Sequence, residues 1–194
     1  HRDLGEAYFR HGRLKDALRA FHKAQKLFRG EGDGANQRDV LERMITIDPD
    51  DMGLHIQLAE RYEKDGVREK ALEHFRTASE QLYEEGRLDE FVQVAERLVF
   101  LSPQEVDLRK QVVRIYLDRN DNKHALKHLQ LLFKDRPEDI ETLEMLGQTF
   151  ARLGSNDKAV MVYQELARAF YKNGYEQRTL ETYRKILKLD PNHA

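Results

Sequence analysis

The chain has 194 residues and no cysteine, and its 33 lysine and arginine residues nearly balance its 35 aspartate and glutamate residues, for a formal net charge of -2. The lack of cysteine excludes disulfides, thiolate metal sites and cysteine nucleophiles. The charge balance provides no general attraction to nucleic acid or anionic lipid, and no apolar run reaches the about 18 residues of a membrane-spanning helix, so we expect neither nucleic acid binding nor membrane insertion.

The first predicted helix carries a cluster of residues that recurs along the chain. The four copies are Leu4-Gly5 with Tyr8, Leu58-Ala59 with Tyr62, Val112-Val113 with Tyr116, and Leu146-Gly147 with Phe150, at intervals of 54, 54 and 34 residues. The same intervals separate Ala17, Ala71, Ala125 and Ala159, and also Phe21, Phe75, Leu129 and Tyr163. Such periods are typical of stacked repeats, in which each unit buries its apolar face against its neighbours.

Helices are expected throughout the chain, because apolar residues return every three or four positions, and the pattern predicts about eleven of them and no strand. Equivalent sites after the first helix of each copy hold Gly12, Gly66, Asn120 and Gly154. Glycine and asparagine tolerate the left-handed conformation that ends a helix, so we expect a turn at each of these sites.

Proline provides the second stop signal. It occurs in Asp48-Pro49, Ser102-Pro103, Arg136-Pro137 and Asp190-Pro191. Because proline suits the first position of a helix and Asp or Ser can cap it, we expect one helix to end and the next to start at each pair. Residues 102–105 also have the spacing of a capping box.

These residues resemble tetratricopeptide repeats, whose pattern of about 34 residues contains Leu-Gly, Tyr, a turn, Ala, Phe, Ala and a closing Pro. The resemblance implies an all-α fold, a right-handed superhelix of antiparallel helix hairpins. The two intervals of 54 residues leave room for an extra helix, which predicts three-helix units at about 3–50, 52–103 and 138–191 and a two-helix unit at 104–137, all within one array over residues 1–194. Since the chain opens inside a helical pattern at His1 and closes on a helix junction, we interpret it as a fragment of a longer protein.

The family resemblance implies a function as a scaffold or adaptor that binds a peptide or a folded protein in its groove, for example in a bacterial assembly, polarity or motility system. The alternative is a regulatory or substrate-recruiting array of a larger enzyme, and reading the full-length gene would separate the two. Self-association through uncapped repeat ends is a third alternative. We expect no catalytic residue, cofactor or bound metal in this chain, and a cytoplasmic location is the default expectation.

By analogy with the family, the partner-binding residues are the outward-facing ones on the first helix of each unit. They are Arg2, Glu6, Phe9 and Arg10, then Glu60, Glu63 and Lys64, then Lys110, Arg114 and Leu117, then Gln148 and Arg152. Their mixed charges predict a mixed-charge partner, although any of them also fits an ordinary solvated helix face. Phe9 is interpreted either as an aromatic anchor or as a residue packed under an upstream helix.

Lys110 and Arg114 lie one helical turn apart and are expected to be exposed, where they could grip a carboxylate. The resemblance includes a basic clamp of this kind, but the asparagines that accompany it in the family are missing.

Three patterns mimic chemical sites. His124 and His128 have the spacing of two helical metal ligands, but Ala125 replaces the glutamate of a zinc protease and no third ligand is evident. The run Asp118, Asn120, Asn122 begins like a calcium loop but lacks its glycine and its final glutamate, which indicates a turn. Finally, Gly30, Gly32 and Gly34 follow a helix and enclose two acidic residues, which indicates a hairpin tip and not a phosphate loop.

Overall fold

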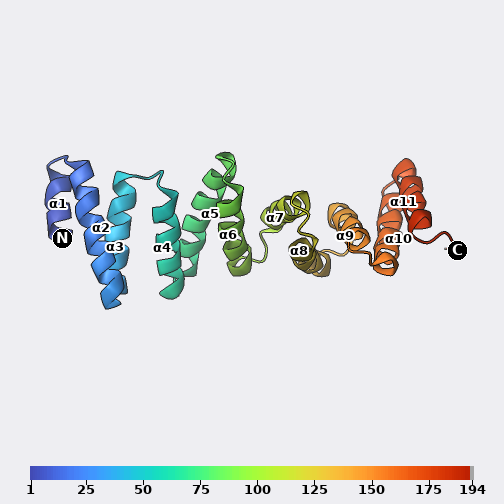
Figure 1. The fold of residues 1–194 in the computed structure, drawn as a ribbon, viewed down its shortest axis with the longest axis horizontal. Coiled ribbons are helices and arrows are strands. Elements are labelled where there is room, and N and C mark those ends of the chain that lie inside the picture. Colours follow the sequence, from blue (N-terminus) through green and yellow to red (C-terminus); the bar gives the residue numbers. More distant parts are fainter. Residues whose placement is uncertain (193–194) are drawn as a thin grey trace. The chain divides into compact units, whose positions relative to one another are not determined.

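A computed structural model describes residues 1–192 of the chain, and this part contains eleven helices and no strand (Figure 1). The helices fall into two compact units, His1–Pro103 and Gln104–Ala194. The first unit contains α1 (Arg2–Arg10), α2 (Leu14–Glu31), α3 (Gly34–Ile47), α4 (Met52–Lys64), α5 (Arg68–Glu84) and α6 (Leu88–Leu101). The second contains α7 (Val106–Asp118), α8 (Asn122–Asp135), α9 (Ile140–Arg152), α10 (Asn156–Lys172) and α11 (Glu176–Leu189). The expected all-helical class and number of helices are confirmed.

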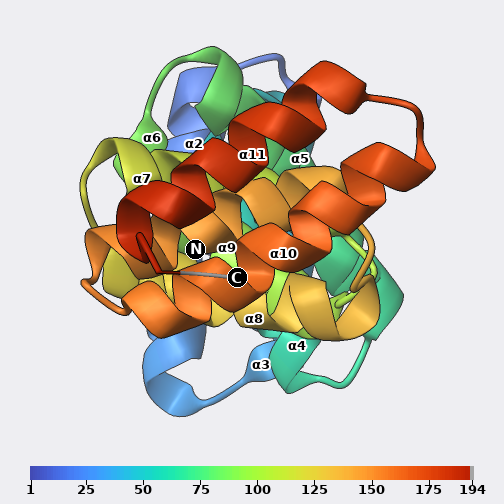
Figure 2. The ribbon, with the colours of Figure 1, turned by 90° about the vertical axis from the view of Figure 1, so that its right-hand side faces the viewer.

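Within each unit, helices that follow one another in the chain pack side by side. In the first unit α2 contacts both α1 and α3, and α5 contacts both α4 and α6. In the second unit α10 contacts both α9 and α11, and Figure 2 shows α10 beside α11. The second helix of each of these groups therefore also serves as the first helix of the next hairpin, as the longer repeat interval predicts.

The first two helices of a repeat approach closely because one of them carries a small residue at the contact. A Cβ atom added to Gly5 would lie 2.6 Å from the ring of Phe21, and one added to Gly147 would lie 2.5 Å from the ring of Tyr163. The alanine that follows twelve residues later, Ala17 or Ala159, is fully buried. The recurring cluster of the sequence is thus the set of side chains that brings two antiparallel helices together.

The turns after the first helices adopt the expected left-handed backbone. The φ angles are 70° at Gly12, 75° at Gly66, 57° at Asn120 and 70° at Gly154. Asn120 is the one non-glycine residue with positive φ among the described residues. The four equivalent turns are therefore confirmed, and they end each first helix at the same point of the repeat.

The proline prediction is wrong in its detail. Pro49, Pro103 and Pro137 lie in the turns between helices and not at the first helical position, and the following helices begin at Met52, Val106 and Ile140. The predicted capping box at residues 102–105 lies in the turn between α6 and α7 and not at a helix start, since Ser102 follows the last residue of α6 and α7 begins at Val106. Aspartates further along provide the caps instead: a carboxylate oxygen of Asp51 accepts from the Leu54 amide at 3.2 Å, and one of Asp139 accepts from the Thr142 amide at 2.8 Å.

The core follows the helix faces that meet within each unit. In the first unit its largest fully buried side chains include Phe21, Phe75 and Phe91, and in the second unit Leu129, Leu143 and Phe170 are buried. Within residues 1–192, no helix combines the length and the apolar character needed to cross a lipid bilayer.

Candidate functional site

The predicted binding residues of α1 form bonds within the first unit. Nη1 of Arg2 donates to the side chain of Asn36 at 2.6 Å, and the carboxylate of Glu6 lies 3.1 Å from Nε of Arg43. Both partners belong to α3, so these bonds link α1 to α3. Phe9 is half-buried and Arg10 is exposed.

Two of the predicted binding residues on α4 are already bound by a side chain of the same unit. Glu60 and Glu63 both accept from the guanidinium of Arg97 on α6, at 2.5 and 3.0 Å. Arg97 in turn lies over the ring of Phe75, with 5.6 Å between the guanidinium carbon and the ring centroid. The third predicted residue of this helix, Lys64, is exposed.

In the second unit, the structure corrects the expectation for Lys110. Its side chain is buried, with the residue only 7% exposed, and its Nζ lies 2.8 Å from Asp139 and 3.0 Å from Glu141. Arg114 also binds Glu141. The residues proposed to grip a carboxylate therefore already hold two carboxylates of their own unit.

The ionisation of this cluster follows from its geometry. Burial by itself lowers the pKa of Lys110, but the bonds to Asp139 and Glu141 outweigh burial and raise that pKa above its usual value. Burial by itself raises the pKa of Asp139, but the bonds from Lys110 and Thr142 outweigh burial and lower that pKa. All members of the cluster are therefore charged near neutral pH and stabilise one another.

The remaining predicted residues connect α7 with α9. Leu117 packs against the core of the second unit, and its carbonyl oxygen accepts from Nη1 of Arg152 at 3.2 Å. Gln148 is partly buried on α9. The structure thus brings Leu117 and Arg152 together, although in a contact that supports the fold.

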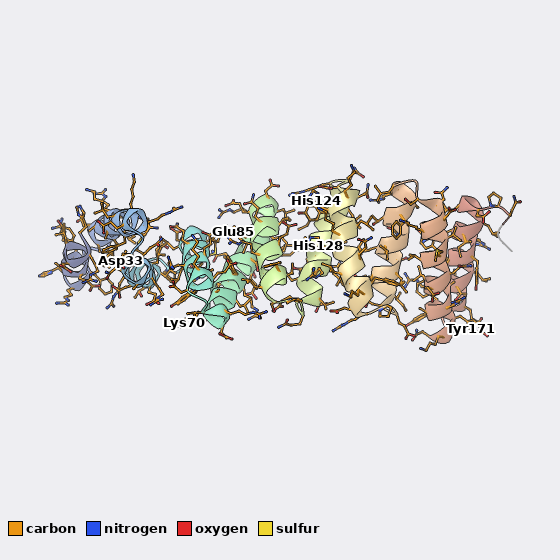
Figure 3. All side chains as sticks on the ribbon, turned by 90° about the horizontal axis from the view of Figure 1, so that it is seen from below. Asp33, Lys70, Glu85, His124, His128 and Tyr171 are labelled. Atoms are coloured by element: carbon orange, nitrogen blue, oxygen red, sulfur yellow. The ribbon has the colours of Figure 1, made fainter. Side chains whose placement is uncertain are left out.

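The patterns that mimic metal and phosphate sites have structural roles. His124 and His128 both lie on α8 (Figure 3). Nδ1 of His124 lies 2.7 Å from a carboxylate oxygen of Asp121, and Tyr116 stacks against both histidines. In the part of the chain that the structure describes, no three metal-ligating side chains come together. Gly32 ends α2 in the left-handed conformation, with φ of 73°.

A cavity of about 110 Å³ lies in the first unit where α2 ends, α3 begins and α4 passes beside them. Its walls are formed by Arg29, Gly32, Gln37, Gln57, Glu60, Arg61 and Lys64. Two of these residues, Glu60 and Lys64, belong to the binding set that the sequence predicts, while Arg29, Gln37, Gln57 and Arg61 were missed. We take this cavity, which we call the α2–α4 cavity, as the candidate binding site.

Gly34 makes room for the central side chain of this cavity. A Cβ atom on Gly34 would lie 2.6 Å from Cζ of Arg61, so only glycine allows the guanidinium to lie there. Arg61 also binds the carboxylate of Asp65, which accepts a second bond from Arg38 at 2.7 Å. The bonds from Arg61 and Arg38 lower the pKa of Asp65, so its carboxylate stays charged and holds both guanidinium groups.

The sequence contains one signal for this site. The positions equivalent to Gly34 in the aligned copies are Leu88 and Glu176, so glycine replaces a side chain at the start of α3 alone. An unexplained glycine at the start of a helix indicates a close approach by another group. The sequence does not identify the approaching group as Arg61. Arg61 lies on the next helix, at a position that the repeat pattern does not mark.

The repeated hairpins define a class: this is a helical-repeat protein in which, within each unit, neighbouring helices pack side by side. Residues 113–173 and 162–193 match two family models, each described as tetratricopeptide repeat. The residues before them repeat the same close helix contact, at Gly5, and the same left-handed turns. Residues 113–193 therefore carry tetratricopeptide repeats.

Three solved structures illustrate what the chain is similar to. YrrB, a TPR protein described as having an unusual peptide-binding site, is 13% identical over 82% of this chain and 88% of its own, with a TM-score of 0.46. TTC0263, a thermophilic TPR protein of Thermus thermophilus, is 17% identical over 86% of this chain and 98% of its own, with a TM-score of 0.42. The MamA protein is 14% identical over 90% of this chain and 92% of its own, with a TM-score of 0.36. Among curated protein sequences, none is significantly similar to this chain.

Proposed function

We propose that this chain is a non-catalytic protein-interaction module that binds a peptide or a segment of a folded protein. The observation that carries the proposal is the recurrence of one close contact between helices. Gly5 and Gly147 lie against aromatic rings at this contact, and Ala71 and Ala125 are fully buried at a second recurring position of the repeat. This repetition fixes the side chains that each hairpin presents before a partner arrives. A rigid, preformed surface lowers the ordering cost of binding and suits a scaffold.

The proposal places a binding surface in each unit: the polar face around the α2–α4 cavity in the first, and the exposed Arg114 and Arg152 in the second. Family resemblance also motivates the narrower proposals of a bacterial assembly, polarity or motility system and a cytoplasmic location. The other predicted residues that form internal bonds serve mainly to hold this surface in shape.

The experiment that tests the proposal is site-specific photo-crosslinking in the native organism. A photoreactive amino acid is placed at Lys64, at Arg152 and, as a control, at the exposed Lys15 on α2. We expect the first two positions, but not the third, to crosslink to the same defined protein partner. Equal labelling of all three positions, or no crosslinked protein at any of them, would contradict an interaction module of this kind.

The same partner experiment tests self-association. Crosslinks from Lys64 or Arg152 to a second copy of this chain, together with sedimentation that depends on protein concentration, would make the chain its own partner. A heterologous partner that crosslinks to a chain sedimenting as a monomer would contradict it.

A further inference from the structure

The α2–α4 cavity has an excess of positive charge that its own residues do not neutralise. Arg29 and Lys64 on its walls are exposed and form no ion pair with any described residue, and Arg61 adds a third cation. The single carboxylate on the walls is that of Glu60, and it is bound by Arg97 at 2.5 Å. The cavity therefore attracts an anionic group from outside.

Arg61 contributes a buried donor that lacks an acceptor. Its Nε is buried and has no hydrogen-bond partner, although the other end of the guanidinium binds Asp65. A buried N–H without an acceptor costs free energy comparable to a lost hydrogen bond, and most such groups in folded proteins are satisfied. A small turn of the Arg61 side chain would bring this N–H to an acceptor oxygen of a ligand at the cavity and satisfy it.

The polar groups of the cavity are held in place before any ligand binds. The bond to Asp65 and the lack of a side chain at Gly34 fix Arg61, and the amide of Gln57 is fixed because its oxygen accepts from Gln25 at 2.7 Å. Gln25 is 9% exposed, so this bond is shielded from water. Donors that are fixed in advance bind a ligand at a lower entropic cost.

We infer that the α2–α4 cavity binds the side-chain carboxylate of an acidic segment of a protein partner. This inference rests on the proposed function, since it names the chemistry that one site of the interaction module recognises. A carboxylate carries a single negative charge and two acceptor oxygens, which suits the cations of Arg29, Arg61 and Lys64. A phosphate group offers the same acceptor oxygens, and the titration arms below distinguish it from the carboxylate.

The direct test is a peptide titration followed at Arg61 itself. The probe is an end-blocked hexapeptide with three glutamates, and the matched peptide has glutamines in their place. The readout is the Nε–H resonance of Arg61 in the isotope-labelled 194-residue chain. We expect a saturable shift of this resonance with the glutamate peptide, weaker at high salt, and none with the glutamine peptide.

Two exposed cations allow a test that does not endanger the fold. Lys64→Gln and Arg29→Gln are each expected to weaken binding of the glutamate peptide by about fivefold, as loss of one charged contact should. Lys23→Gln, an exposed lysine of α2 that does not line the cavity, is the matched control and should leave binding unchanged. Gly34→Ala should displace Arg61 and abolish the Nε–H shift while the circular dichroism spectrum stays helical.

The outcomes separate the inference from the proposed function. Equal shifts with both peptides, or unchanged binding in Lys64→Gln and Arg29→Gln, would overturn the carboxylate site. Tighter binding of a phosphoserine hexapeptide or of inorganic phosphate would overturn the choice of carboxylate over phosphate. If a crosslinked natural partner binds these variants as well as the wild type, the inference fails while the interaction module stands.

Discussion

Gly147 faces Tyr163 so closely that a Cβ atom on the glycine would lie 2.5 Å from Cε1 of the tyrosine ring. In the equivalent pairs along the chain, a larger side chain at the first position is matched by a smaller one at the second. The pairs are Gly5 with Phe21, Ala59 with Phe75, Val113 with Leu129, and Gly147 with Tyr163. Where the second residue is the smaller leucine, the first is the larger valine, so the two positions share one fixed volume.

We expect Gly147→Ala to destabilise the second unit by about 1–3 kcal/mol, because the new methyl group forces the ring of Tyr163 out of its packed position. Adding Tyr163→Leu should recover part of this loss, since the equivalent pair Val113 and Leu129 accepts a larger residue opposite leucine. Urea denaturation of both single variants and of the double variant gives the coupling free energy. Strictly additive effects would show that the two residues do not share a volume.

The bonds of Lys110, which the sequence predicts to be exposed, lead to a second prediction. An exposed lysine on a helix contributes little to stability, but Lys110 is buried and paired with Asp139 and Glu141. Lys110→Met should cost about 1–3 kcal/mol, less than the about 3–5 kcal/mol of a fully buried pair, because both carboxylates keep some contact with water. Thermal denaturation at neutral pH measures the loss.

Lys127→Met, at an exposed position of α8, is the control for the removal of a lysine charge. The pKa of Asp139 is lowered in the folded chain, so its contribution is present above its unfolded pKa and is lost as the pH falls through the folded value. The difference between wild type and Lys110→Met should therefore shrink in acid. A difference that stays constant from neutral pH down to strongly acidic pH would contradict this role of the ion pair.

The contrast between these two sites shows what the sequence predicts well. The close contact at Gly147 recurs in every repeat and depends only on the size of two residues at a fixed spacing, so periodicity reveals it. The bonds of Lys110 depend on two carboxylates that lie about thirty positions away and are not repeated in the other copies. A charged residue on the first helix therefore looks exposed from the pattern alone.

The candidate site follows the same rule. Glu60 and Lys64 were predicted because they occupy the outward face of a first helix, whereas Arg29 and Gln37 reach the cavity from the end of α2 and the start of α3. No periodic signal marks those ends. Nor does the spacing of the prolines reveal that Asp51 and Asp139 cap the following helices, because a proline fits a turn as well as a first helical position.

The left-handed turns give a third prediction. Asn120 has φ of 57° where the equivalent sites are glycines. Asn120→Gly should be neutral or stabilise the fold by less than about 1 kcal/mol, while Asn120→Val should destabilise it by about 1–2 kcal/mol, because a β-branched residue strains in this conformation. Gly154→Ala should cost about 1 kcal/mol for the same reason, although its Cβ would meet no atom within 4 Å. Chemical denaturation measures all three, and equal stability of Asn120→Val and Asn120→Gly would contradict the conformational argument.

The last prediction concerns acid sensitivity of the first unit, where two histidines share a hydrogen bond. Nδ1 of His55 lies 3.1 Å from Nδ1 of His74, and Nε2 of His55 lies 3.0 Å from the carbonyl oxygen of Pro49. Because a carbonyl can only accept, Nε2 of His55 carries the hydrogen, its Nδ1 accepts, and Nδ1 of His74 donates. The hydrogen of the shared bond is therefore assigned to His74.

Burial, followed by the neighbouring His55, lowers the pKa of His74 below its ordinary value of 6.5. The ring also stacks on Tyr62, with 5.8 Å between ring centroids, and the charged groups near it are Glu73 and Lys70 on α5 and Glu42 on α3. Since the folded pKa is lower than the unfolded one, the stabilisation is fully present above about pH 6.5 and is lost as the pH falls through the folded value.

We therefore expect the free energy of unfolding of the first unit to fall between about pH 7 and pH 5 more steeply in the wild type than in His74→Gln, whose amide can still donate to His55 but does not titrate. Hydrogen exchange of α4 and α5 amides across this range, corrected for the intrinsic pH dependence of exchange, localises the effect. His22→Gln, at an exposed position of α2, is the control for loss of a histidine. The same slope in His74→Gln as in the wild type would assign the acid sensitivity to other groups, because a residue that cannot bind a proton cannot link protonation to folding.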